Sequence, residues 1–391
     1  MDDLIVVGTE SDNPFVEDIV EFLNQQEDYS DLISLKCFSN TEFCPRFIIN
    51  EHGWNNIGQK LNGKTILIAS SSVNNLTRND LAMRNFLVAR AAKDNGASRV
   101  ILLEPDLFYS AQDRGPRPEH GIIGFIRDPA DYKKFDGQPF SARMYADLLQ
   151  RAGVDEVVTI HNHSSAVKNI FMDRLSGYFH NLQPADVYAS YMKDSDIINE
   201  KNLILCAPDR GAISFLYEVQ GALGRPDVPL LFMEKIRTGE REVSMEVGPL
   251  SPSKLEDVTG KDVAVIDDMV RTGLTIVECC RLIKKVNPRR IILFVTHFYS
   301  SREARVNLND PVIDEIVTTN TIPQILNKDM QGRLRHKLVV LRLEKWIANY
   351  LLEMMGAPPN SLTGPLYREE ISSKNPRWKG KMGPLFSSLY F

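Results

Sequence analysis

The sequence predicts an α/β fold of two consecutive domains, each a mostly parallel sheet flanked by helices. Short apolar runs alternate with helical patterns over residues 4–160, and the alternation begins again over residues 203–341. Such alternation is typical of parallel sheets, because parallel neighbours need a crossover connection and a helix usually provides it. A length of 391 residues is also sufficient for two complete hydrophobic cores. We therefore place the join between the domains near residues 175–185.

The first domain is predicted over residues 1–178. Residues 4–8 are apolar, and they precede the turn residues 9–12 and an apolar-periodic run that ends at Phe22. A strand, a capped turn and a helix are expected there in that order. Further strands are expected at residues 65–69, 99–103 and 157–160, and further helices at residues 79–95 and 142–152.

The second domain is predicted over residues 179–343, followed by a closing helix at residues 344–356 and an extension at residues 357–391. The extension combines Gly, Pro and Ser residues with several large apolar side chains, which would be costly to leave in water. We expect it to lie in a groove of its own or a neighbouring subunit, and a disordered tail is the alternative. The strands of this domain are expected at residues 203–205, 230–232, 263–267, 291–296 and 338–341.

The composition is that of an ordinary globular protein. Hydrophobic residues make up 43% of the chain, charged residues make up 25%, and the net charge is −5. Nucleic acid is therefore not an expected partner. No run approaches the roughly 18–20 apolar residues of a membrane helix, so no membrane partner is expected. The start Met1-Asp2-Asp3 lacks the basic residues of a signal peptide, and the five cysteines show no zinc spacing, so we expect a cytoplasmic protein.

The stretch at residues 263–275 has the pattern of a phosphate-binding strand, loop and helix. Four apolar residues precede Asp267 and Asp268, and a short loop then leads into a helical run. Loop N–H groups and the hydroxyls of Thr272 and Thr275 can converge on a phosphate at the helix N-terminus, where unpaired donors and the dipole favour an anion. The two carboxylates would suit sugar hydroxyls or a metal ion. A helix N-cap beside a solvated strand end is the plainer alternative.

Polar residues also follow other predicted strands. Ligands of open parallel sheets bind beyond the carboxyl ends of the strands, so these residues are expected to share one rim. Each segment has a plainer interpretation, since an isolated histidine is commonly a satisfied polar group, Pro-Asp-Arg-Gly is a good turn, and a hydrophilic loop is commonly just solvated. Their joint placement favours a site. The candidate side chains are His163, Asp209, Lys235 and Arg237.

Nine segments of the chain resemble, in order, signatures of the ribose-phosphate pyrophosphokinase family. One of them lies in the stretch of residues 263–275, which resembles the phosphoribosyl-binding loop of the type I phosphoribosyltransferase fold. The resemblance covers roughly residues 4–356 and implies two tandem type I phosphoribosyltransferase-like domains. The segments are residues 38–42, 109–114, 139–143, 163, 208–211, 235–237, 267–275, 296–300 and 319–323.

The resemblance implies transfer of the terminal pyrophosphate of ATP to the anomeric hydroxyl of ribose 5-phosphate, giving phosphoribosyl pyrophosphate and AMP. Lys235 and Arg237 would be catalytic, on a flexible loop, by stabilising the charge of the transferred group. His163 and Asp209 would hold Mg²⁺ on the ATP phosphates. The implied ATP contacts are Phe38, Asn40, Thr41, Glu42, Gln112 and Asp113, and the implied ribose 5-phosphate contacts are Asp267, Asp268, Arg271, Thr272, Gly273, Leu274 and Thr275.

The family's nucleotide segment comes from a neighbouring subunit, so the resemblance also implies a homo-oligomer, of the dimer or hexamer-of-dimers type. Some residues depart from the family pattern. Ala111 stands where the family has an arginine, and Thr41 stands where it has a glycine, which narrows the backbone's freedom. An insertion at residues 115–138 adjoins the nucleotide segment, and we expect it to reshape the ATP site or a regulatory site.

Three other functions stay open from the sequence. The protein could be a phosphoribosyltransferase, because the loop of residues 271–275 has a single glycine and is closer to the version of this loop found in those enzymes. Ala111 favours a non-catalytic regulatory subunit of the same fold. A pyrophosphokinase for a different ribosyl phosphate is the third alternative.

Overall fold

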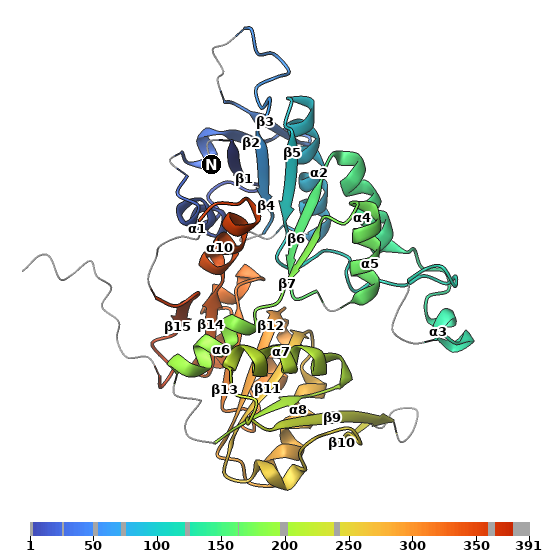
Figure 1. Cartoon of the computed structure of the whole chain (residues 1–391), viewed down its shortest axis with the longest axis vertical. Helices are drawn as coiled ribbons and strands as arrows, with labels where there is room; N and C mark the ends of the chain where they lie inside the picture. The colour runs from blue at the N-terminus through green and yellow to red at the C-terminus, as the bar shows by residue number, and fades with distance from the viewer. Residues whose placement is uncertain are drawn as a thin grey trace, which may run out of the picture. The chain divides into compact units, whose positions relative to one another are not determined.

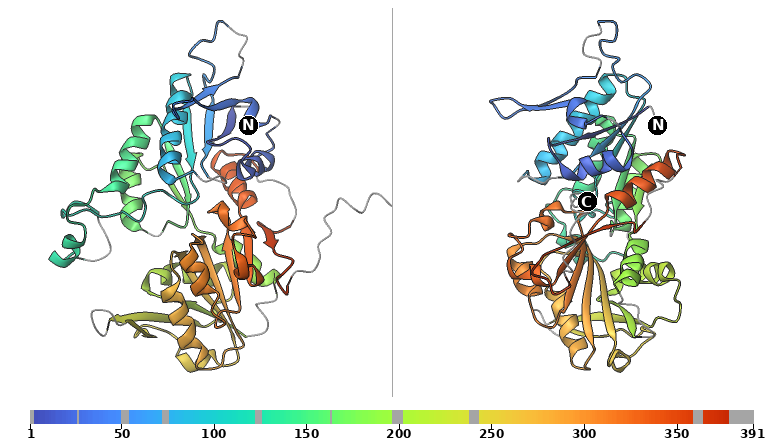
Figure 2. Two further views of the ribbon diagram at one scale, coloured as in Figure 1. Left: turned by 180° about the vertical axis from the view of Figure 1, so that it is seen from behind. Right: turned by 90° about the vertical axis from the view of Figure 1, so that its left-hand side faces the viewer.

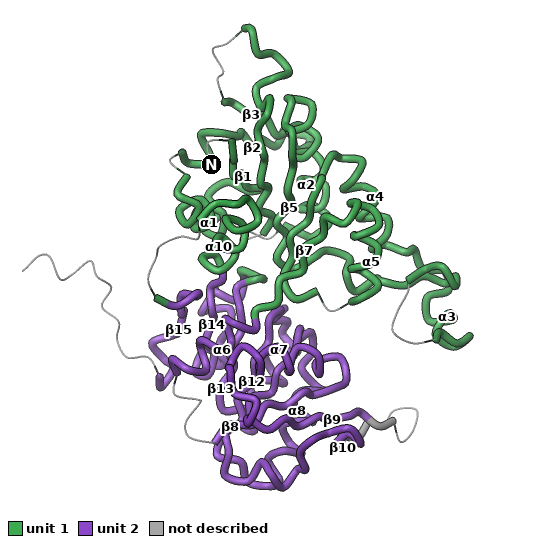
Figure 3. The backbone as a smooth tube through the Cα atoms, in the orientation of Figure 1, with its two compact units in different colours: residues 1–184, 321–323, 344–364 green, residues 185–320, 324–343, 365–391 purple. Residues whose placement is uncertain are grey.

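The chain divides into two compact units in this computed structural model (Figures 1 and 3). The first unit comprises residues 1–184, 321–323 and 344–364, and the second comprises residues 185–320, 324–343 and 365–391. The chain thus passes from the first unit to the second after Pro184; the sequence analysis places the join near residues 175–185 and draws the boundary at 178/179. The structure describes residues 3–25, 27–49, 54–71, 76–121, 126–162, 164–195, 202–237, 243–358 and 364–377.

The first unit is built on a five-stranded parallel sheet with the order β1-β4-β5-β6-β7. A separate antiparallel hairpin is formed by β2 and β3. The strands are β1 (Leu4–Gly8), β2 (Ile33–Cys37), β3 (Phe43–Phe47), β4 (Thr65–Ala69), β5 (Arg99–Leu103), β6 (Glu156–Ile160) and β7 (Phe179–Leu182). The helices are α1 (Pro14–Phe22), α2 (Arg78–Asp94), α3 (Pro129–Lys134), α4 (Ser141–Ala152), α5 (Ser165–Arg174) and α10 (Glu344–Met354).

Helix ends in the first unit follow local chemistry. The backbone N–H of Asp80 donates to the hydroxyl of Thr77 (3.2 Å), and the backbone N–H of Thr77 donates back to the carboxylate of Asp80 (2.9 Å). This capping box satisfies donors at the start of α2 that would otherwise lack a partner. Gly153 ends α4 with a φ of 103°, a conformation that glycine adopts without strain.

The predicted closing helix is α10, and the chain returns to the first unit to form it. It packs against α1. The hydroxyl of Tyr350 lies 2.8 Å from Nδ1 of His180, which joins α10 to β7. Two segments far apart in the sequence therefore complete one core.

The second unit contains an eight-stranded sheet with the order β10-β9-β8-β11-β12-β13-β14-β15, in which only the two outermost pairs are antiparallel. Its helices cover both faces of the sheet (Figure 2). The strands are β8 (Leu203–Ala207), β9 (Leu230–Arg237), β10 (Val243–Val247), β11 (Asp262–Val270), β12 (Arg290–Phe298), β13 (Glu315–Thr319), β14 (Leu338–Arg342) and β15 (Arg368–Ile371). The main helices are α6 (Ala185–Asp194), α7 (Ile213–Leu223), α8 (Leu274–Lys284) and α9 (Arg302–Leu308).

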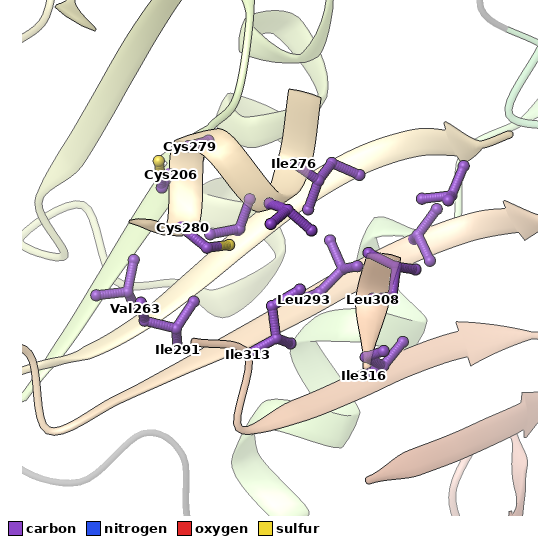
Figure 4. Close-up of a cluster of buried hydrophobic side chains, with 14 of the residues drawn as sticks. Cys206, Val263, Ile276, Cys279, Cys280, Ile291, Leu293, Leu308, Ile313 and Ile316 are labelled. Carbon is purple, nitrogen blue, oxygen red and sulfur yellow. The ribbon is translucent and has the colours of Figure 1, made fainter. Parts of the chain in front are cut away.

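The core of this unit follows from the alternation of side chains along its strands. Val263 and Leu293 point toward α8, where they join a fully buried cluster with Ile276 and Cys279 (Figure 4). Phe294, the next residue on β12, points to the other face, where its ring packs against Tyr188 of α6 with the centroids 5.4 Å apart. Continuous burial of both faces is typical of parallel strands between helical layers, so the predicted α/β fold is confirmed.

Part of the C-terminal extension packs on its own chain. Strand β15 pairs antiparallel with β14, and the ring of Tyr367 is buried. Arg377 forms an ion pair with the buried Glu315 and also donates to the hydroxyl of Tyr191. Residues 364–377 thus take one of the two placements predicted for the extension, and residues 378–391 lie outside the described part of the chain.

Several strands are longer than the sequence predicts, and two of them contain candidate site residues. Strand β9 continues to Arg237 because β10 pairs with it from Met233 onward, so the backbone of Lys235 and Arg237 belongs to a strand rather than to a loop. Strand β11 continues to Val270 because it stays paired with β12, so Asp267 and Asp268 lie within the strand. Charged residues interrupt the apolar run in both strands, Glu234 and Lys235 in β9 and Asp267 and Asp268 in β11, so the predicted strands end too early. Among the described residues, no helix has the length and apolar character needed to cross a membrane.

Candidate functional site

The candidate site of the second unit lies where neighbouring strands of its sheet end at different levels. Strand β8 pairs with β11 only as far as Val265, whereas β12 pairs with β11 through Val270. The last part of β11 therefore runs beyond β8. Asp267 and Asp268 lie in this projecting part, which is the rim where open parallel sheets bind ligands.

The surroundings of Asp267 disfavour the charged form of its carboxyl group. Burial, together with the nearby carboxylates of Asp268 and Asp209, raises the pKa of Asp267 well above its ordinary value. The backbone N–H of Asp268 donates to Oδ1 of Asp267 (3.0 Å), which partly offsets this effect. Among the described residues, no ion pair involves Asp267 or Asp209. A carboxyl group in such surroundings can accept hydrogen bonds from sugar hydroxyls, or can bind a cation that arrives together with a substrate.

The loop after β11 has the geometry of an anion site. Gly273 is the N-cap of α8 and has a φ of 78°, a left-handed conformation that disfavours residues with a side chain. In this part of the described chain no side chain caps the first turn of α8. Its N–H groups are therefore available to a ligand, and the helix dipole favours an anion. Thr272 is exposed and Thr275 is half-buried, beside Arg271 and Leu274, which are exposed.

Asp209 has a structural task as well as a possible ligand. It is the N-cap of the 3₁₀ turn Arg210–Ala212, and its Oδ1 accepts from the backbone N–H of Gly211 (2.8 Å). Arg210 forms a two-pronged ion pair with Glu234 of β9, at 2.8 and 3.1 Å. The plainer interpretation of Pro-Asp-Arg-Gly as a turn is thus realised. Asp209 is nevertheless close enough to Asp267 to raise its pKa.

Lys235 is exposed on β9, opposite Met245 of β10. Its neighbour Glu234 is engaged with Arg210, and side chains of adjacent strand residues point to opposite faces. Lys235 therefore projects from the other face of the hairpin. The backbone of Arg237 ends β9, and its side chain lies outside the described atoms, as does the whole of His163.

The carboxylates on this rim are oxygen donors of the kind that Mg²⁺ prefers. Among the described residues, no group of three His, Cys, Asp or Glu side chains is arranged to hold a metal ion. Magnesium commonly binds proteins through one or two carboxylates together with substrate phosphates, and a partial donor set of this kind fits that mode. Asp209, Asp267 and Asp268 are the described residues that could contribute.

The candidate nucleotide segment at residues 38–42 forms the turn of the β2–β3 hairpin in the first unit. Phe38 is 45% exposed, with the ammonium of Lys36 5.1 Å from its ring centroid. Oδ1 of Asn40 accepts from the backbone N–H of Glu42 (3.2 Å). Thr41 has a φ of 72°, which is unfavourable for a β-branched residue and explains why a glycine suits this position.

The other candidate nucleotide segment has one exposed and one buried residue. Gln112 is exposed. Asp113 is buried and accepts from the hydroxyl of Ser164 (2.6 Å), the N-cap of α5. Asp113 thereby anchors the start of a helix, and Arg114 pairs with it at 3.3 Å. This engagement leaves Gln112 as the more accessible of the two predicted ATP contacts.

The insertion at residues 115–138 contains a folded element organised by one arginine. The guanidinium of Arg127 pairs with Asp131 (2.6 Å) and donates to the backbone carbonyls of Gly115 and His120 (both 2.8 Å). Arg114 also pairs with Asp131, at 3.0 Å. The insertion is thus connected by ion pairs to the segment that contains Gln112 and Asp113, and its residues 122–125 lie outside the described chain.

Sequence reasoning missed one buried acid of the first unit. Glu104 follows β5 and is completely buried, with its carboxylate accepting from the backbone N–H of Phe108 (2.5 Å), the hydroxyl of Tyr145 (2.6 Å) and the amide of Asn85 (2.9 Å). Burial raises the pKa of Glu104 to about 7. Its place directly after a strand was the available signal.

Sequence reasoning also missed two residues that contact the loop after β11. The hydroxyl of Ser301 donates to the backbone carbonyl of Arg271 (3.0 Å), and the side-chain amide of Asn307 donates to that of Thr272 (2.8 Å). Ser301 has the pattern of a helix N-cap, which gives no indication of its contact with the loop. Asn307 carries no signal in the sequence at all.

Comparison with known proteins identifies this architecture. The phosphoribosyl transferase domain model matches residues 185–326. The ribose-phosphate pyrophosphokinase of Corynebacterium efficiens is 29% identical over 246 residues, which is 63% of this chain and 66% of that protein's length. The ribose-phosphate pyrophosphokinase of Haemophilus ducreyi is 27% identical over 295 residues, which is 75% of this chain and 81% of that protein.

A solved structure has the same fold over most of the chain. The phosphoribosylpyrophosphate synthetase from Mycobacterium smegmatis superposes with a TM-score of 0.67 and 22% identity, covering 90% of this chain and 99% of the other. The sequence similarities thus mark the chain as a divergent relative of the ribose-phosphate pyrophosphokinases, and the solved structure shows that it has the same fold.

Proposed function

We propose that the protein transfers the terminal pyrophosphate of ATP to the anomeric hydroxyl of ribose 5-phosphate. In this reaction the hydroxyl oxygen attacks the β-phosphorus of ATP, the bond from that phosphorus to the α-phosphate oxygen breaks, and AMP leaves. The observation that carries the proposal is the pair of acids on β11 followed directly by the uncapped N-terminus of α8. A sugar phosphate needs both, because one group binds its hydroxyls and the other binds its phosphate.

In the proposed reaction, residues of the second unit bind the acceptor. Asp267 and Asp268 accept hydrogen bonds from the ribose hydroxyls, and the loop of residues 271–275 receives the 5-phosphate through N–H groups and the threonine hydroxyls. The dense negative charge of the transferred group needs cations and positioning more than a covalent nucleophile. Lys235 and Arg237 are proposed for this task, Lys235 as a compact charge and Arg237 as a bidentate fork.

ATP is proposed to contact the first unit of a subunit. The exposed ring of Phe38 can stack on the adenine, while Asn40, Glu42 and Gln112 offer polar groups. Mg²⁺, when bound with the nucleotide, neutralises phosphate charge and orients the transferred group. His163 and Asp209 are the proposed protein ligands. We further propose a cytoplasmic homo-oligomer, in which this segment serves a neighbouring subunit's active site.

The decisive test is an assay for AMP formation with ATP, MgCl₂ and ribose 5-phosphate. The proposal predicts AMP and phosphoribosyl pyrophosphate in equal amounts, with both ribose 5-phosphate and Mg²⁺ required. Formation of ADP, or no turnover under conditions where a related pyrophosphokinase is active, would reject the proposed reaction. Replacing ribose 5-phosphate by other ribosyl phosphates in the same assay identifies a different acceptor.

A non-catalytic regulatory role is the second candidate, and Ala111 favours it because a cation that the family places near ATP is missing. This role predicts no turnover by the protein alone, and a change in the kinetics of an active pyrophosphokinase mixed with it. Restoring the cation separates the two functions. If the protein is an enzyme with weakened nucleotide binding, Ala111→Arg lowers the KM for ATP, whereas a regulatory subunit stays inactive.

A further inference from the structure

The loop of residues 271–275 is held by two side chains, one from α9 and one from the N-cap of that helix. The hydroxyl of Ser301 donates to the carbonyl oxygen of Arg271 (3.0 Å), and the amide Nδ2 of Asn307 donates to the carbonyl oxygen of Thr272 (2.8 Å). Both donors come from α9 or its N-cap, and both acceptors are consecutive loop carbonyls. Two adjacent peptide groups are thus fixed by one helix.

Fixing these carbonyls also fixes the direction of the loop's N–H groups. In a planar trans peptide the N–H points opposite to the C=O of the preceding residue. The carbonyl of Arg271 points to Ser301, so the N–H of Thr272 points away from α9, and the N–H of Gly273 does so for the same reason. In the described part of the chain neither N–H has a backbone acceptor. Both thus face away from α9 and can donate to an anion bound at the N-terminus of α8.

Helix α9 is itself a rigid support. Ala304 and Leu308 are completely buried in the core cluster, and the backbone N–H of Ala304 donates to the hydroxyl of Ser301 (3.1 Å). A Cβ on Gly273 would lie 2.9 Å from Cδ2 of Leu308, so the loop is packed as closely against α9 as a glycine allows. The Ser301 hydroxyl thus caps α9 and holds the loop at the same time.

We propose that Ser301 and Asn307 are positioning residues, which set the loop amides for the 5-phosphate of the sugar substrate. This inference rests on the proposed function, because that function assigns the sugar phosphate to the loop. Neither residue touches the substrate. Their contribution is that the N–H groups need no reorganisation when the phosphate arrives, so binding costs less.

The test uses Asn307→Asp, which keeps the size of the side chain and replaces the donor by a carboxylate that cannot donate. Asn309→Asp is the matched control, since Asn309 is exposed at the end of the same helix and adds the same charge. We expect Asn307→Asp to weaken ribose 5-phosphate binding about tenfold, the effect of losing roughly one hydrogen bond, and to leave the KM for ATP unchanged. The Asn309→Asp protein should match the wild type.

Binding is measured on the full chain by calorimetry with ribose 5-phosphate and with inorganic phosphate, apart from any turnover. Wild-type protein that binds ribose 5-phosphate but forms no AMP would reject the proposed function, and the comparison of dissociation constants would still decide the positioning role. Equal affinity of wild type and Asn307→Asp would overturn the inference, as would equal losses in both aspartate variants or no binding of either ligand by the wild type.

Ser301 provides an independent arm if Asn307→Asp does not fold. Ser301→Ala removes the donor, and Ser301→Thr keeps a hydroxyl at the same position. We expect the alanine variant to bind ribose 5-phosphate several-fold more weakly and the threonine variant to recover most of the affinity. Equal affinities in the two variants would contradict a role for the hydroxyl in positioning the loop.

Discussion

In the second unit, acidic residues lie at both ends of the parallel strands, but their surroundings differ. We call the side of the sheet where these strands begin the amino edge and the side where they end the carboxyl edge. At the amino edge, the buried Asp262 accepts from Arg289 and Arg290, and the buried Glu315 pairs with Arg377. At the carboxyl edge, Asp267 is surrounded by other acids, and its pKa is raised. The difference indicates that one edge is optimised for stability, whereas the other keeps unfavourable charge for a ligand to relieve.

This comparison predicts that substitutions at the carboxyl edge reduce activity without loss of stability. The largest effect is expected for Lys235→Ala. Lys235 is exposed, so its loss should change the free energy of unfolding by less than about 0.5 kcal/mol. If Lys235 stabilises the transition state, kcat should fall by about two orders of magnitude, which is about 2.7 kcal/mol.

Steady-state kinetics of AMP formation, together with urea unfolding, measures both quantities. Lys284→Ala is the control, because Lys284 is another exposed lysine of the same unit, on α8. It should leave kcat unchanged. Nearly normal turnover by Lys235→Ala would remove Lys235 from the catalytic group.

The amino edge should respond in the opposite way. Asp262→Asn leaves the guanidinium groups of Arg289 and Arg290 without their carboxylate. Losing one member of a buried ion pair costs about 3–5 kcal/mol, but these arginine side chains are 47% and 28% exposed and can recover hydration. We expect a loss of about 2 kcal/mol in the free energy of unfolding, with kcat unchanged for the protein that remains folded.

Urea unfolding followed by circular dichroism gives the free energy. Glu256→Gln, which removes an exposed carboxylate from the same unit, should have no measurable effect. A catalytic defect in Asp262→Asn without loss of stability would break the distinction between the two edges.

Different parts of the second unit were predicted from the sequence with unequal success. Short apolar runs located the parallel strands, because residues buried on both faces leave a continuous signal. The loop of residues 271–275 could be singled out because its Thr-Gly pattern is local, and its role as a phosphate site stays a prediction. The hairpin that contains Lys235 was predicted as a loop, since its charged residues give no apolar alternation to mark the backbone pairing of β9 with β10.

Contacts between distant segments were beyond sequence reasoning. The amide of Asn307 meets a carbonyl 35 residues away, and Arg377 meets a glutamate 62 residues away. Neither residue type announces such a partner, because exposed asparagine and arginine are common on any helix or tail. The unfavourable φ of Thr41 was different, since the family's glycine at that position indicated a special backbone conformation.

The ion pair of the C-terminal segment extends the test to a residue outside the two predicted domains. Arg377→Ala leaves the buried carboxylate of Glu315 with the hydroxyl of Tyr191 as its remaining described partner, at 2.9 Å. Because the arginine side chain is 30% exposed, we expect a loss of about 1.5 kcal/mol in the free energy of unfolding. Thermal and urea unfolding measure it, and turnover should be unchanged.

Arg333→Ala removes an exposed arginine of the same unit and is the matched control. It should be as stable as the wild type. If Arg377→Ala is equally stable, the extension contributes through strand β15 and Tyr367 instead of through this ion pair.

Asp267→Asn provides the smallest and most specific test, since it should make the protein more stable and less able to bind ribose 5-phosphate. Removing one of several neighbouring negative charges is expected to add about 1 kcal/mol to the free energy of unfolding at pH 8. The sign follows from the raised pKa of Asp267, because the folded state then pays for ionising this group.

The pH dependence makes this gain distinguishable from a general improvement in packing. Below about pH 3, where Asp267 is protonated in both states, wild type and variant should be equally stable. As the pH rises from the ordinary pKa of an unfolded aspartate to the raised pKa of the folded protein, the wild type alone loses stability, so the difference should grow over this range and then level off. The measurement is made with a chelator, since a bound cation would relieve the same repulsion. A difference that is independent of pH would mean that folding does not raise the pKa of Asp267. The contrast between the two edges would then have no electrostatic basis.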